Sequence, residues 1–249
     1  MEQKFFFFDI DNTLAVWPEG KIPNSAQYCI DELQRRGHLV SIATGRIQVD
    51  AMRFAEQARI TNVVADGGHS ITIDGKLVSM IGMNRDMCIQ YLEYLESKHI
   101  PWAVTDRNKL GRITPYKEIL EWHPDWDVFK TVVDPEFDFH SVEDFYKIYV
   151  FFKDGEEEEK DIEHMTHKLI RYGEGCVLYE PMEKALGIRN MIGHFDMKPN
   201  QVVVFGDGYN DLSMFRPEWL NIAMGNARAE LKEKADYITT DCDKDGIYN

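Results

Sequence analysis

The run Phe5–Phe8 and the acids that follow it constrain the fold of this chain more than any other stretch. Four consecutive apolar residues without Gly or Pro are too few for a helix, so they predict a strand buried on both faces, as central strands of parallel sheets usually are. The strand ends directly at Asp9 and Asp11. Because open α/β sheets bind ligands at the carboxyl ends of their strands, we expect both carboxylates to lie in a ligand-binding crevice.

Two acids separated by one residue have a chemical and a purely structural interpretation. Such a pair suits a nucleophile or metal ligand beside a proton-transfer group. Close carboxylates also need a cation to hold both negative charges. For Asp9 and Asp11 alone, however, an Asp-rich turn after a strand is the simpler interpretation. The other strand ends decide between the two.

Two more predicted strands carry polar groups at their ends. Leu39–Ala43 precedes a helix-forming segment, and Gln201–Phe205 is a second buried run. The groups that follow them are Thr44, Gly45 and Arg46, and then Asp207, Asn210 and Asp211. In a parallel sheet these ends face one crevice, however distant they are in sequence.

The order of strands and helices predicts an α/β fold with a Rossmann-like parallel sheet and helices on both faces. Helical spacing from Asn24, with Asn24-Ser25 as the expected N-cap, ends near Gly37, and a second helix is expected around 49–58. Val63–Ala65 is the next predicted strand. The signal Asp74-Gly75 then indicates an antiparallel hairpin between 70–73 and 76–81.

After the hairpin the pattern changes, which predicts an inserted α+β domain over residues 83–183 between core segments 1–82 and 184–249. We expect helices over about 88–95 and 156–172, and strands at 102–105, 146–152 and 177–179. Residues 106–135 are poorly periodic and predict no regular element. The parallel rhythm then returns with a helix around 188–195, a strand at 221–223, a helix at 229–235 and a strand at 237–239.

Composition narrows the class of partner. The 249 residues carry a formal charge of -15, which disfavours nucleic acid and anionic membrane surfaces. The four cysteines are scattered without Cys-x-x-Cys spacing, so neither a zinc site nor a disulfide framework is expected. We expect a cytoplasmic monomer or homodimer, with no signal peptide before the first strand and no membrane-spanning run.

The chemistry of the predicted crevice is that of an anion held beside a metal. Oxygen ligands from carboxylates and a carbonyl suit Mg²⁺. Thr44 and the amide of Gly45, before a helix, predict an anion cradle. Lys184, before the second acid cluster, can supply positive charge to a phosphoryl group.

The ordered set of motifs resembles the haloacid dehalogenase-like hydrolase superfamily, and within it the Cof-type sugar-phosphatase branch. The resemblance rests on Asp9-Ile10-Asp11-Asn12-Thr13-Leu14, Ala43-Thr44-Gly45-Arg46, Lys184 and Gly206-Asp207-Gly208-Tyr209-Asn210-Asp211, with Met224-Gly225-Asn226-Ala227 and Ala235-Asp236-Tyr237-Ile238 as tail segments. It covers nearly the whole chain, and the insertion falls where this branch carries a cap domain.

The resemblance implies a role for each matching residue. Asp9 would be the nucleophile that forms an aspartyl-phosphate, and Asp11 the general acid and base. The Mg²⁺ ligands would be Asp9, Asp11 through its carbonyl, and Asp207, with Asp211 in support. The phosphate-binding groups would be Thr44, Gly45, Lys184 and Asn210.

Three departures from the family pattern bear on these expectations. Asn12 replaces a usual Gly, and Asn is the residue that best tolerates a left-handed backbone in its place. Asp66 replaces a usual Asn and brings extra negative charge toward the crevice. The sequence printed here stops at Asn249, where relatives tend to continue into a helix.

Several charged residues outside the motifs are weaker candidates. Arg46 either caps a helix or contacts substrate. In the inserted domain, Arg107, Lys109 and Arg112 belong to a polar cluster that would grip a sugar, although charged loops are often merely solvated. His164 and His167 share a predicted helical face without a third ligand, which favours surface residues over a metal site.

The sequence therefore predicts a Mg²⁺-dependent phosphatase acting on a small phosphorylated metabolite, with a sugar phosphate as the expected substrate. A phosphomutase of the same superfamily uses similar chemistry and remains an alternative. A non-catalytic module that signals through a phosphorylated aspartate is the alternative from another class.

Overall fold

The structure is a computed structural model that describes residues 2–125, 128–153, 156, 161–162 and 169–249. The chain divides into two compact units. We call Met1–Met80 with Met182–Asn249 the core unit and Ile81–Pro181 the inserted unit. Each is described by itself.

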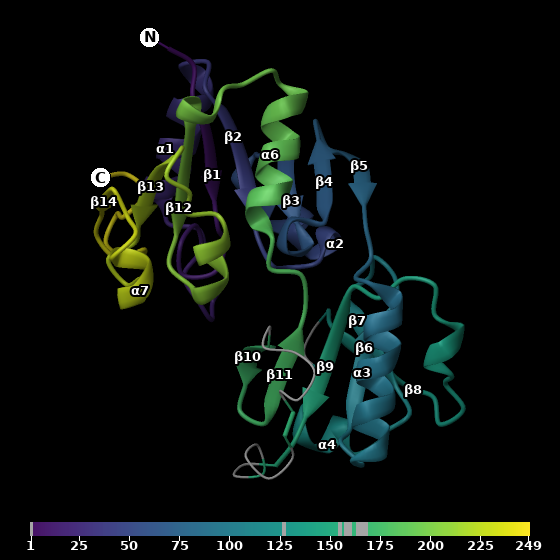
Figure 1. The fold of residues 1–249 in the computed structure, drawn as a ribbon. Coiled ribbons are helices and arrows are strands. Elements are labelled where there is room, and N and C mark those ends of the chain that lie inside the picture. The colour runs from purple at the N-terminus through teal and green to yellow at the C-terminus, as the bar shows by residue number, and fades with distance from the viewer. Residues whose placement is uncertain (1, 126–127, 154–155, 157–160, 163–168) are drawn as a thin grey trace. The chain divides into compact units, whose positions relative to one another are not determined.

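The core unit is built on an eight-stranded sheet in the order β14-β13-β12-β1-β2-β3-β4-β5 (Figure 1). Its strands are β1 Phe5–Phe8, β2 Leu39–Ala43, β3 Asn62–Ala65, β4 Ser70–Ile73, β5 Lys76–Met80, β12 Val202–Gly206, β13 Leu220–Ala223 and β14 Tyr237–Ile238. Neighbours from β14 to β3 pair in parallel, whereas β4 and β5 form the predicted antiparallel hairpin. Central β1 is buried as expected, with Phe5, Phe7 and Phe8 fully covered.

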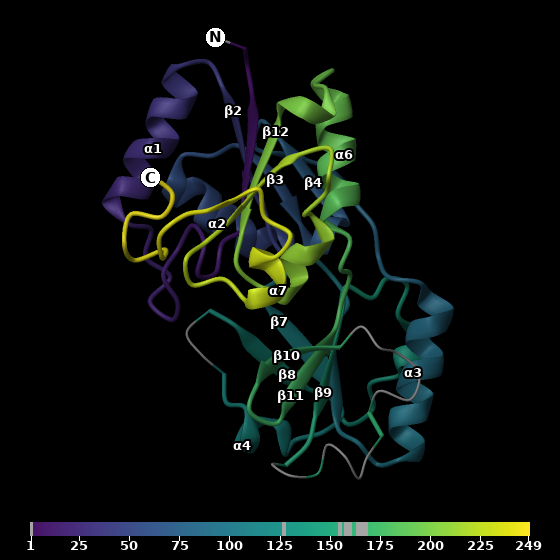
Figure 2. The same ribbon diagram turned by 60° about the vertical axis from the view of Figure 1, so that its left-hand side comes forward.

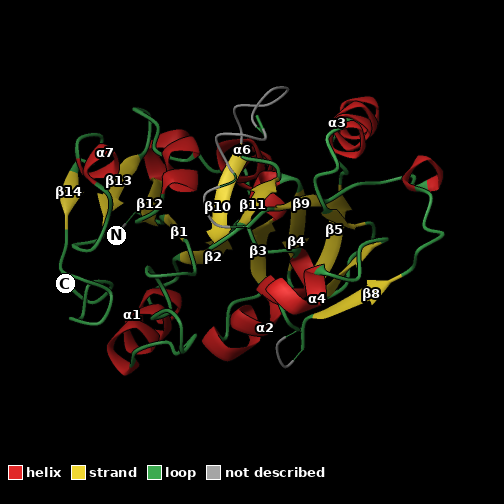
Figure 3. Cartoon of the chain, turned by 90° about the horizontal axis from the view of Figure 1, so that it is seen from below, coloured by secondary structure: helices red, strands yellow, loops and turns green. Residues whose placement is uncertain are grey.

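Helices cover both faces of this sheet, with α1 and α2 on one face and α6 and α7 on the other (Figure 3). Their bounds are α1 Asn24–Arg35, α2 Gln48–Ala58, α6 Lys184–His194 and α7 Ala229–Lys232, and the short 3-10 turns are η1 Asp66–Gly68, η3 Pro199–Gln201 and η4 Tyr209–Ser213. The predicted α/β fold class is confirmed. Within the part of the chain that the structure describes, no helix has the length and apolar character needed to cross a bilayer.

The inserted unit has its own six-stranded sheet in the order β10-β11-β9-β6-β7-β8, and Figure 2 shows helix α3 beside this sheet. Its elements are α3 Arg85–Ser97, β6 Trp102–Thr105, β7 Gly111–Thr114, α4 Ile119–Trp122, β8 Lys130–Val133, η2 Phe139–Ser141, β9 Lys147–Phe151, β10 Leu169–Gly173 and β11 Cys176–Tyr179. Alternate residues enter two apolar clusters: Trp102 and Val104 belong to the cluster that includes α3, whereas Ala103 belongs to another. This period of two is what a sheet covered on both faces requires.

Some predicted elements are wrong. The helix expected over 156–172 is wrong at its C-terminal end, because Leu169–Gly173 is strand β10, which pairs antiparallel with β11. Helical spacing of apolar residues continued by chance into an edge strand whose partner fixes its conformation. Residues 157–160 and 163–168 of this predicted helix, which include His164 and His167, lie outside the described residues. Residues 106–135 do contain regular structure, namely β7, α4 and β8, each only four residues long.

Two helix ends also differ from the prediction. Helix α1 starts at Asn24, so Pro23 takes the N-cap position and no side chain caps the helix. Helix α7 ends at Lys232, three residues before the predicted end at Ala235. Helix ends are set by tertiary contacts as much as by local residue preferences.

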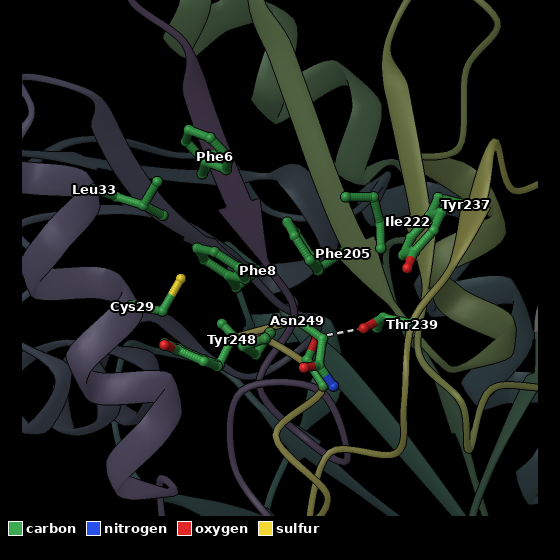
Figure 4. Close-up of a pocket in the computed structure, with 12 residues that line it drawn as sticks. Phe6, Phe8, Cys29, Leu33, Phe205, Ile222, Tyr237, Thr239, Tyr248 and Asn249 are labelled. Carbon is green, nitrogen blue, oxygen red and sulfur yellow. Dashed lines mark hydrogen bonds between the residues drawn. The ribbon is translucent and has the colours of Figure 1, made fainter.

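The segment after β14 covers the face of the core sheet that lies beside α1. Thr239 Oγ1 donates to the Gly246 carbonyl at 2.7 Å, and the Tyr248 ring lies 5.9 Å from that of Tyr28 on α1. Figure 4 shows the pocket of about 280 Å³ that remains under this segment, lined by aromatic residues of the sheet and by the returning chain. Its floor includes Phe6, Phe8, Phe205 and Ile222.

Candidate active site

Parallel pairing brings three strand ends of the core unit together. Phe8, at the end of β1, pairs with Phe205 of β12 on one side and with Ile42 of β2 on the other. The residues that follow these strands therefore emerge next to one another at the carboxyl edge. They include Asp9 after β1, Thr44 after β2 and Asp207 after β12.

A buried ammonium group joins two of the predicted acids. Lys184 Nζ donates to Asp9 Oδ1 and to Asp211 Oδ1, both at 2.6 Å. The exposed fraction is 0% for Lys184 and Asp211 and 5% for Asp9. Lys184 is the first residue of α6, and its amide donates to Ser213 Oγ of η4 at 3.2 Å, which fixes the start of the helix against the acid-bearing turn.

Asp211 organises the loop after β12 as well as binding the lysine. Its Oδ2 accepts from the amides of Asp207 at 2.8 Å and Gly208 at 2.9 Å. A Cβ at Gly206 would lie 2.7 Å from the Asp211 side chain, so only glycine lets the carboxylate approach. Asp207 in turn accepts from Thr13 Oγ1 at 2.8 Å, a contact between the two acid-bearing loops.

The electrostatics of the cluster reflect burial and crowding of like charges. Burial, and then repulsion from Asp211, raise the pKa of Asp9 well above its ordinary value, despite the opposing effect of Lys184. The same two causes raise the pKa of Asp207 to about 7. Burial alone would lower the pKa of Lys184, but the carboxylates of Asp211 and Asp9 outweigh it and raise that pKa. Without a further cation, Asp9 and Asp207 therefore keep their protons to a higher pH than ordinary aspartates do.

These acids have the chemistry of a divalent-metal site. One oxygen from each of Asp9, Asp207 and Asp211 lies within 4.8 Å of the other two. Carboxylate oxygens are the ligands that Mg²⁺ prefers, and a dication would relieve the repulsion that raises the pKa values. The residues therefore fit a Mg²⁺ ion.

Asp11 is held by Arg46 through two parallel contacts. Arg46 Nη2 donates to Asp11 Oδ1 at 2.7 Å, and Nε donates to Oδ2 at 2.9 Å. The remaining nitrogen, Nη1, donates to Asp50 Oδ2 at 2.6 Å. The guanidinium carbon also lies 4.5 Å from the centre of the Phe54 ring. Ile47 is the N-cap residue of α2, so the predicted capping role of Arg46 is wrong. The Arg46 side chain binds the carboxylates of Asp11 and Asp50, and its contact with substrate stays a prediction.

The predicted phosphate-binding residues are distributed over two loops. Thr44 is buried, and its Oγ1 accepts from the Arg46 amide at 3.1 Å. Gly45 follows it on the way into α2, and Asn210 lies in η4 beside the acid cluster. All belong to the core unit, as do Asp9, Asp11 and Lys184.

The loop that follows β3 supports the backbone at Thr44 and Arg46. Asp66, which is 1% exposed, adopts a left-handed backbone with φ of 49°, and its amide donates to the Arg46 carbonyl at 2.8 Å. Asp66 Oδ2 accepts from the Gln48 amide at the start of α2 at 3.0 Å. The unexpected acid thus satisfies a helix N-terminus, where negative charge is favourable.

The same loop packs tightly against α6. Gly68 has φ of +109°, and a Cβ there would lie 2.2 Å from the Glu183 carbonyl oxygen. The Glu183 amide donates to the Gly67 carbonyl at 2.7 Å. The close approach holds the residue before Lys184 in place. Sequence reasoning missed this support, although the pair Gly67-Gly68 after a strand was a visible signal.

The nucleophile loop is also tied to the C-terminal segment. Asn12 has φ of 57°, so Asn does occupy the left-handed position expected of it. Its carbonyl accepts from Asn226 Nδ2 at 2.8 Å, and Asn226 Oδ1 accepts from the Cys242 amide at 2.8 Å. Sequence reasoning recognised the segment that contains Asn226 but gave this side chain no role.

Candidate residues in the inserted unit have different surroundings. Asp106 binds Arg107 at 2.9 Å and Lys109 at 3.4 Å. Arg112 is 3% exposed and donates to Thr131 Oγ1 and to the His123 carbonyl, both at 2.9 Å. Its guanidinium also lies over three aromatic rings, those of Phe129, Tyr149 and Phe151. Arg112 therefore packs within the inserted unit rather than in a solvated loop.

Comparison with known proteins gives the class to which this site belongs. A family model of the haloacid dehalogenase-like hydrolases matches residues 6–249. The chain therefore belongs to this family, and the predicted family resemblance is confirmed. Bacillus subtilis YkrA, a candidate phosphatase, is 30% identical over 99% of this chain and 96% of its own length. The B. subtilis 5-amino-6-(5-phospho-D-ribitylamino)uracil phosphatase YwtE is 26% identical over 98% of this chain and 95% of its own. Both relatives support the prediction that this chain is a phosphatase.

One relative is much longer. A Streptococcus pyogenes protein named for phosphatase and peptidyl-prolyl cis-trans isomerase activities is 29% identical over 98% of this chain, which spans only 52% of that protein. Among solved structures, a Geobacillus kaustophilus protein is 28% identical with a TM-score of 0.83, covering 99% of this chain and 96% of that one. The subclass IIB sugar phosphatase BT4131 is 25% identical with a TM-score of 0.77 over the same shares of the two chains.

Proposed function

We propose that this protein is a Mg²⁺-dependent phosphatase that hydrolyses a small phosphorylated metabolite, with a sugar phosphate as the substrate. The observation that carries the proposal is the buried Lys184 ammonium held between Asp9 and Asp211 beside Asp207. The arrangement supports this function because it would combine a nucleophile, metal-binding acids and a fixed positive charge in one cluster. The relatives named as phosphatases support the same reaction.

In this proposal Asp9 attacks the substrate phosphorus. Lys184 binds Oδ1, so Oδ2 is the atom that forms the bond to phosphorus. Asp11 gives a proton to the departing alcohol oxygen and later takes one from the water that hydrolyses the aspartyl-phosphate. The lysine charge also attracts the phosphoryl oxygens as negative charge spreads over them.

The surrounding residues hold the phosphate and the metal. Thr44, Gly45 and Asn210 would donate hydrogen bonds to the phosphoryl oxygens. The Mg²⁺ ligands would be Asp9, the Asp11 carbonyl and Asp207, while Asp211 keeps the loop of Asp207 in position through its two amide contacts. When bound, Mg²⁺ would neutralise charge on the phosphate and on the acids.

We propose that the inserted unit serves as the cap that selects the substrate. Arg107 and Lys109, joined by Asp106, are the candidates for contact with the sugar. Arg112 is committed to contacts inside the inserted unit and is a weaker choice. An exchange of cap residues should therefore change the substrate preference without changing the chemistry.

The direct test is release of inorganic phosphate from a panel of phosphate monoesters with Mg²⁺, using the Asp9→Asn variant as the blank. We expect turnover by the wild type, none by the variant, and loss of turnover after removal of the metal with EDTA. Equal phosphate release by wild type and Asp9→Asn would contradict the proposal.

The same panel distinguishes the two alternatives. A phosphomutase would convert glucose or mannose phosphates into isomers with little free phosphate. A signalling module would retain a stable phospho-aspartate and turn over nothing. Measurement of free phosphate, isomerised sugar and protein-bound phosphate in one incubation separates all three.

A further inference from the structure

The contact between Arg46 and Asp11 joins the proposed general acid to helix α2. Both carboxylate oxygens of Asp11 accept from the guanidinium, at 2.7 and 2.9 Å. The exposed fraction of the side chain is 22% for Arg46 and 38% for Asp11, so both side chains are partly covered but still accessible to solvent. A single contact would leave rotation about the Cβ–Cγ bond of Asp11 free, whereas two parallel contacts fix the plane of the carboxylate.

Arg46 is itself held on three sides. Asp50, in the first turn of α2, accepts from Nη1 at 2.6 Å, and the guanidinium carbon lies over the Phe54 ring, 4.5 Å from its centre. The backbone of Arg46 is fixed by the Asp66 amide at its carbonyl and by Thr44 Oγ1 at its amide. A planar group restrained in this way can transmit an orientation, which a flexible lysine could not do.

We infer that Arg46 is a positioning residue that orients the Asp11 carboxyl group toward the oxygen of the departing alcohol. The inference rests on the proposed function. In the step concerned, Asp9 Oδ2 forms a bond to phosphorus, and the bond from phosphorus to the alcohol oxygen breaks with its electron pair going to that oxygen. The proton of Asp11 goes to the same oxygen. The protonated oxygen of Asp11 keeps a lone pair that can accept a hydrogen bond, so both contacts with Arg46 can persist while that oxygen carries the proton.

The inference has a kinetic signature that simple loss of structure does not have. The need for a proton grows as the departing alcohol becomes more basic, so misplacement of Asp11 slows poor leaving groups most. The quantity kcat/KM includes every step up to release of the alcohol, whereas kcat also includes hydrolysis of the aspartyl-phosphate. The dependence of kcat/KM on the leaving group therefore isolates the proton transfer that Arg46 would support.

The experiment compares wild type and Arg46→Met on a series of substituted phenyl phosphates, from 4-nitrophenyl to unsubstituted, and on the best alkyl phosphate of the panel. We expect kcat/KM to fall about 100-fold for the alkyl phosphate and less than about tenfold for 4-nitrophenyl phosphate. The plot against leaving-group basicity should become steeper. Arg46→Lys should resemble Arg46→Met, because an ammonium cannot bind both oxygens in one plane.

Two variants of α2 keep the test decisive if Arg46→Met folds poorly. Asp50→Asn weakens the support of Arg46 without touching Asp11, and it should steepen the same plot with a loss of about threefold to tenfold for the alkyl phosphate. Arg53→Gln is the matched control: Arg53 is 49% exposed and binds the other oxygen of Asp50, Oδ1, at 3.1 Å. It should give a plot parallel to that of the wild type.

The outcomes separate this inference from the proposed function. Hydrolysis by the wild type with a uniform loss across all leaving groups in Arg46→Met and Asp50→Asn would overturn the inference alone. A rise in KM with unchanged kcat for every ester would show substrate contact instead of positioning, and would also overturn it. Absence of Asp9-dependent hydrolysis by the wild type would overturn both.

Discussion

The Asp207→Asn substitution is expected to stabilise the metal-free protein above pH 7. Burial and repulsion from Asp211 raise the pKa of Asp207 from 3.8 to about 7 in the folded state. A carboxyl group with a raised folded pKa binds more protons when folded than when unfolded, between about pH 4 and pH 7. The contribution of Asp207 to the stability of the metal-free wild type therefore falls as the pH rises through this window, and an uncharged asparagine avoids that loss.

The size of the effect follows from the shift. One pKa unit corresponds to about 1.4 kcal/mol, so a change from 3.8 to about 7 sets an upper limit of about 4 kcal/mol at pH 8. Asparagine is nearly the same size and its carbonyl oxygen can still accept from Thr13 Oγ1, so the contact at 2.8 Å can survive. We expect the variant to gain about 2 to 4 kcal/mol at pH 8 and almost nothing at pH 4.

The measurement is urea unfolding in EDTA at several pH values, with hydrogen exchange of amides in β1 and β12 to report on the core unit. Asp243→Asn, an exposed acid, serves as the control for a change of net charge. Added Mg²⁺ should stabilise the wild type far more than the variant, since binding to the folded state alone shifts the unfolding equilibrium. A variant no more stable than the wild type at pH 8, or an advantage that does not shrink toward pH 4, would refute the reasoning.

Three further predictions test other parts of the structure. Lys184→Met leaves Asp9 and Asp211 without their buried partner and should lower the free energy of unfolding by about 3 to 5 kcal/mol at pH 8, less at pH 5, in the same urea experiment; an equal loss at both pH values would contradict this. Gly68→Ala should destabilise by about 3 kcal/mol or more, because its Cβ would meet the Glu183 carbonyl at 2.2 Å. Gly37→Ala, also at positive φ but in open space, should lose only about 1 kcal/mol, and equal losses would refute the steric argument. Arg112→Met should lower the thermal midpoint by unpairing the His123 carbonyl while leaving phosphate release per folded molecule unchanged.

The sequence predicted the core unit well because its signals are local. The buried run Phe5–Phe8 and the turn Asp74-Gly75 each specify a conformation within a few residues. The expected parallel pairing of their strands was enough to predict that Asp9 and Asp207 lie close together. The motifs that identify the family are also short, local segments, and their order along the chain can be read without the structure.

The inserted unit was predicted less well because its short elements depend on partners. Strands β7 and β8 contain four residues each and pair with each other across a separation of about twenty positions, which leaves no periodic pattern to detect. Leu169–Gly173 is a strand only because β11 lies beside it. Likewise, no spacing rule connects Arg46 to Asp11 or Asn226 to Asn12, since these contacts depend on side-chain directions in three dimensions.

The position of β1 at the centre of its sheet determines the order in which this chain can mature during synthesis. One neighbour, β2, leaves the ribosome early, whereas β12 follows almost two hundred residues later. Until then the nascent chain presents a phenylalanine-rich strand with an open edge, the kind of surface that chaperones bind. The inserted unit is one continuous segment, 81–181, so its synthesis is complete before that of the core unit. We therefore expect the inserted unit to fold first.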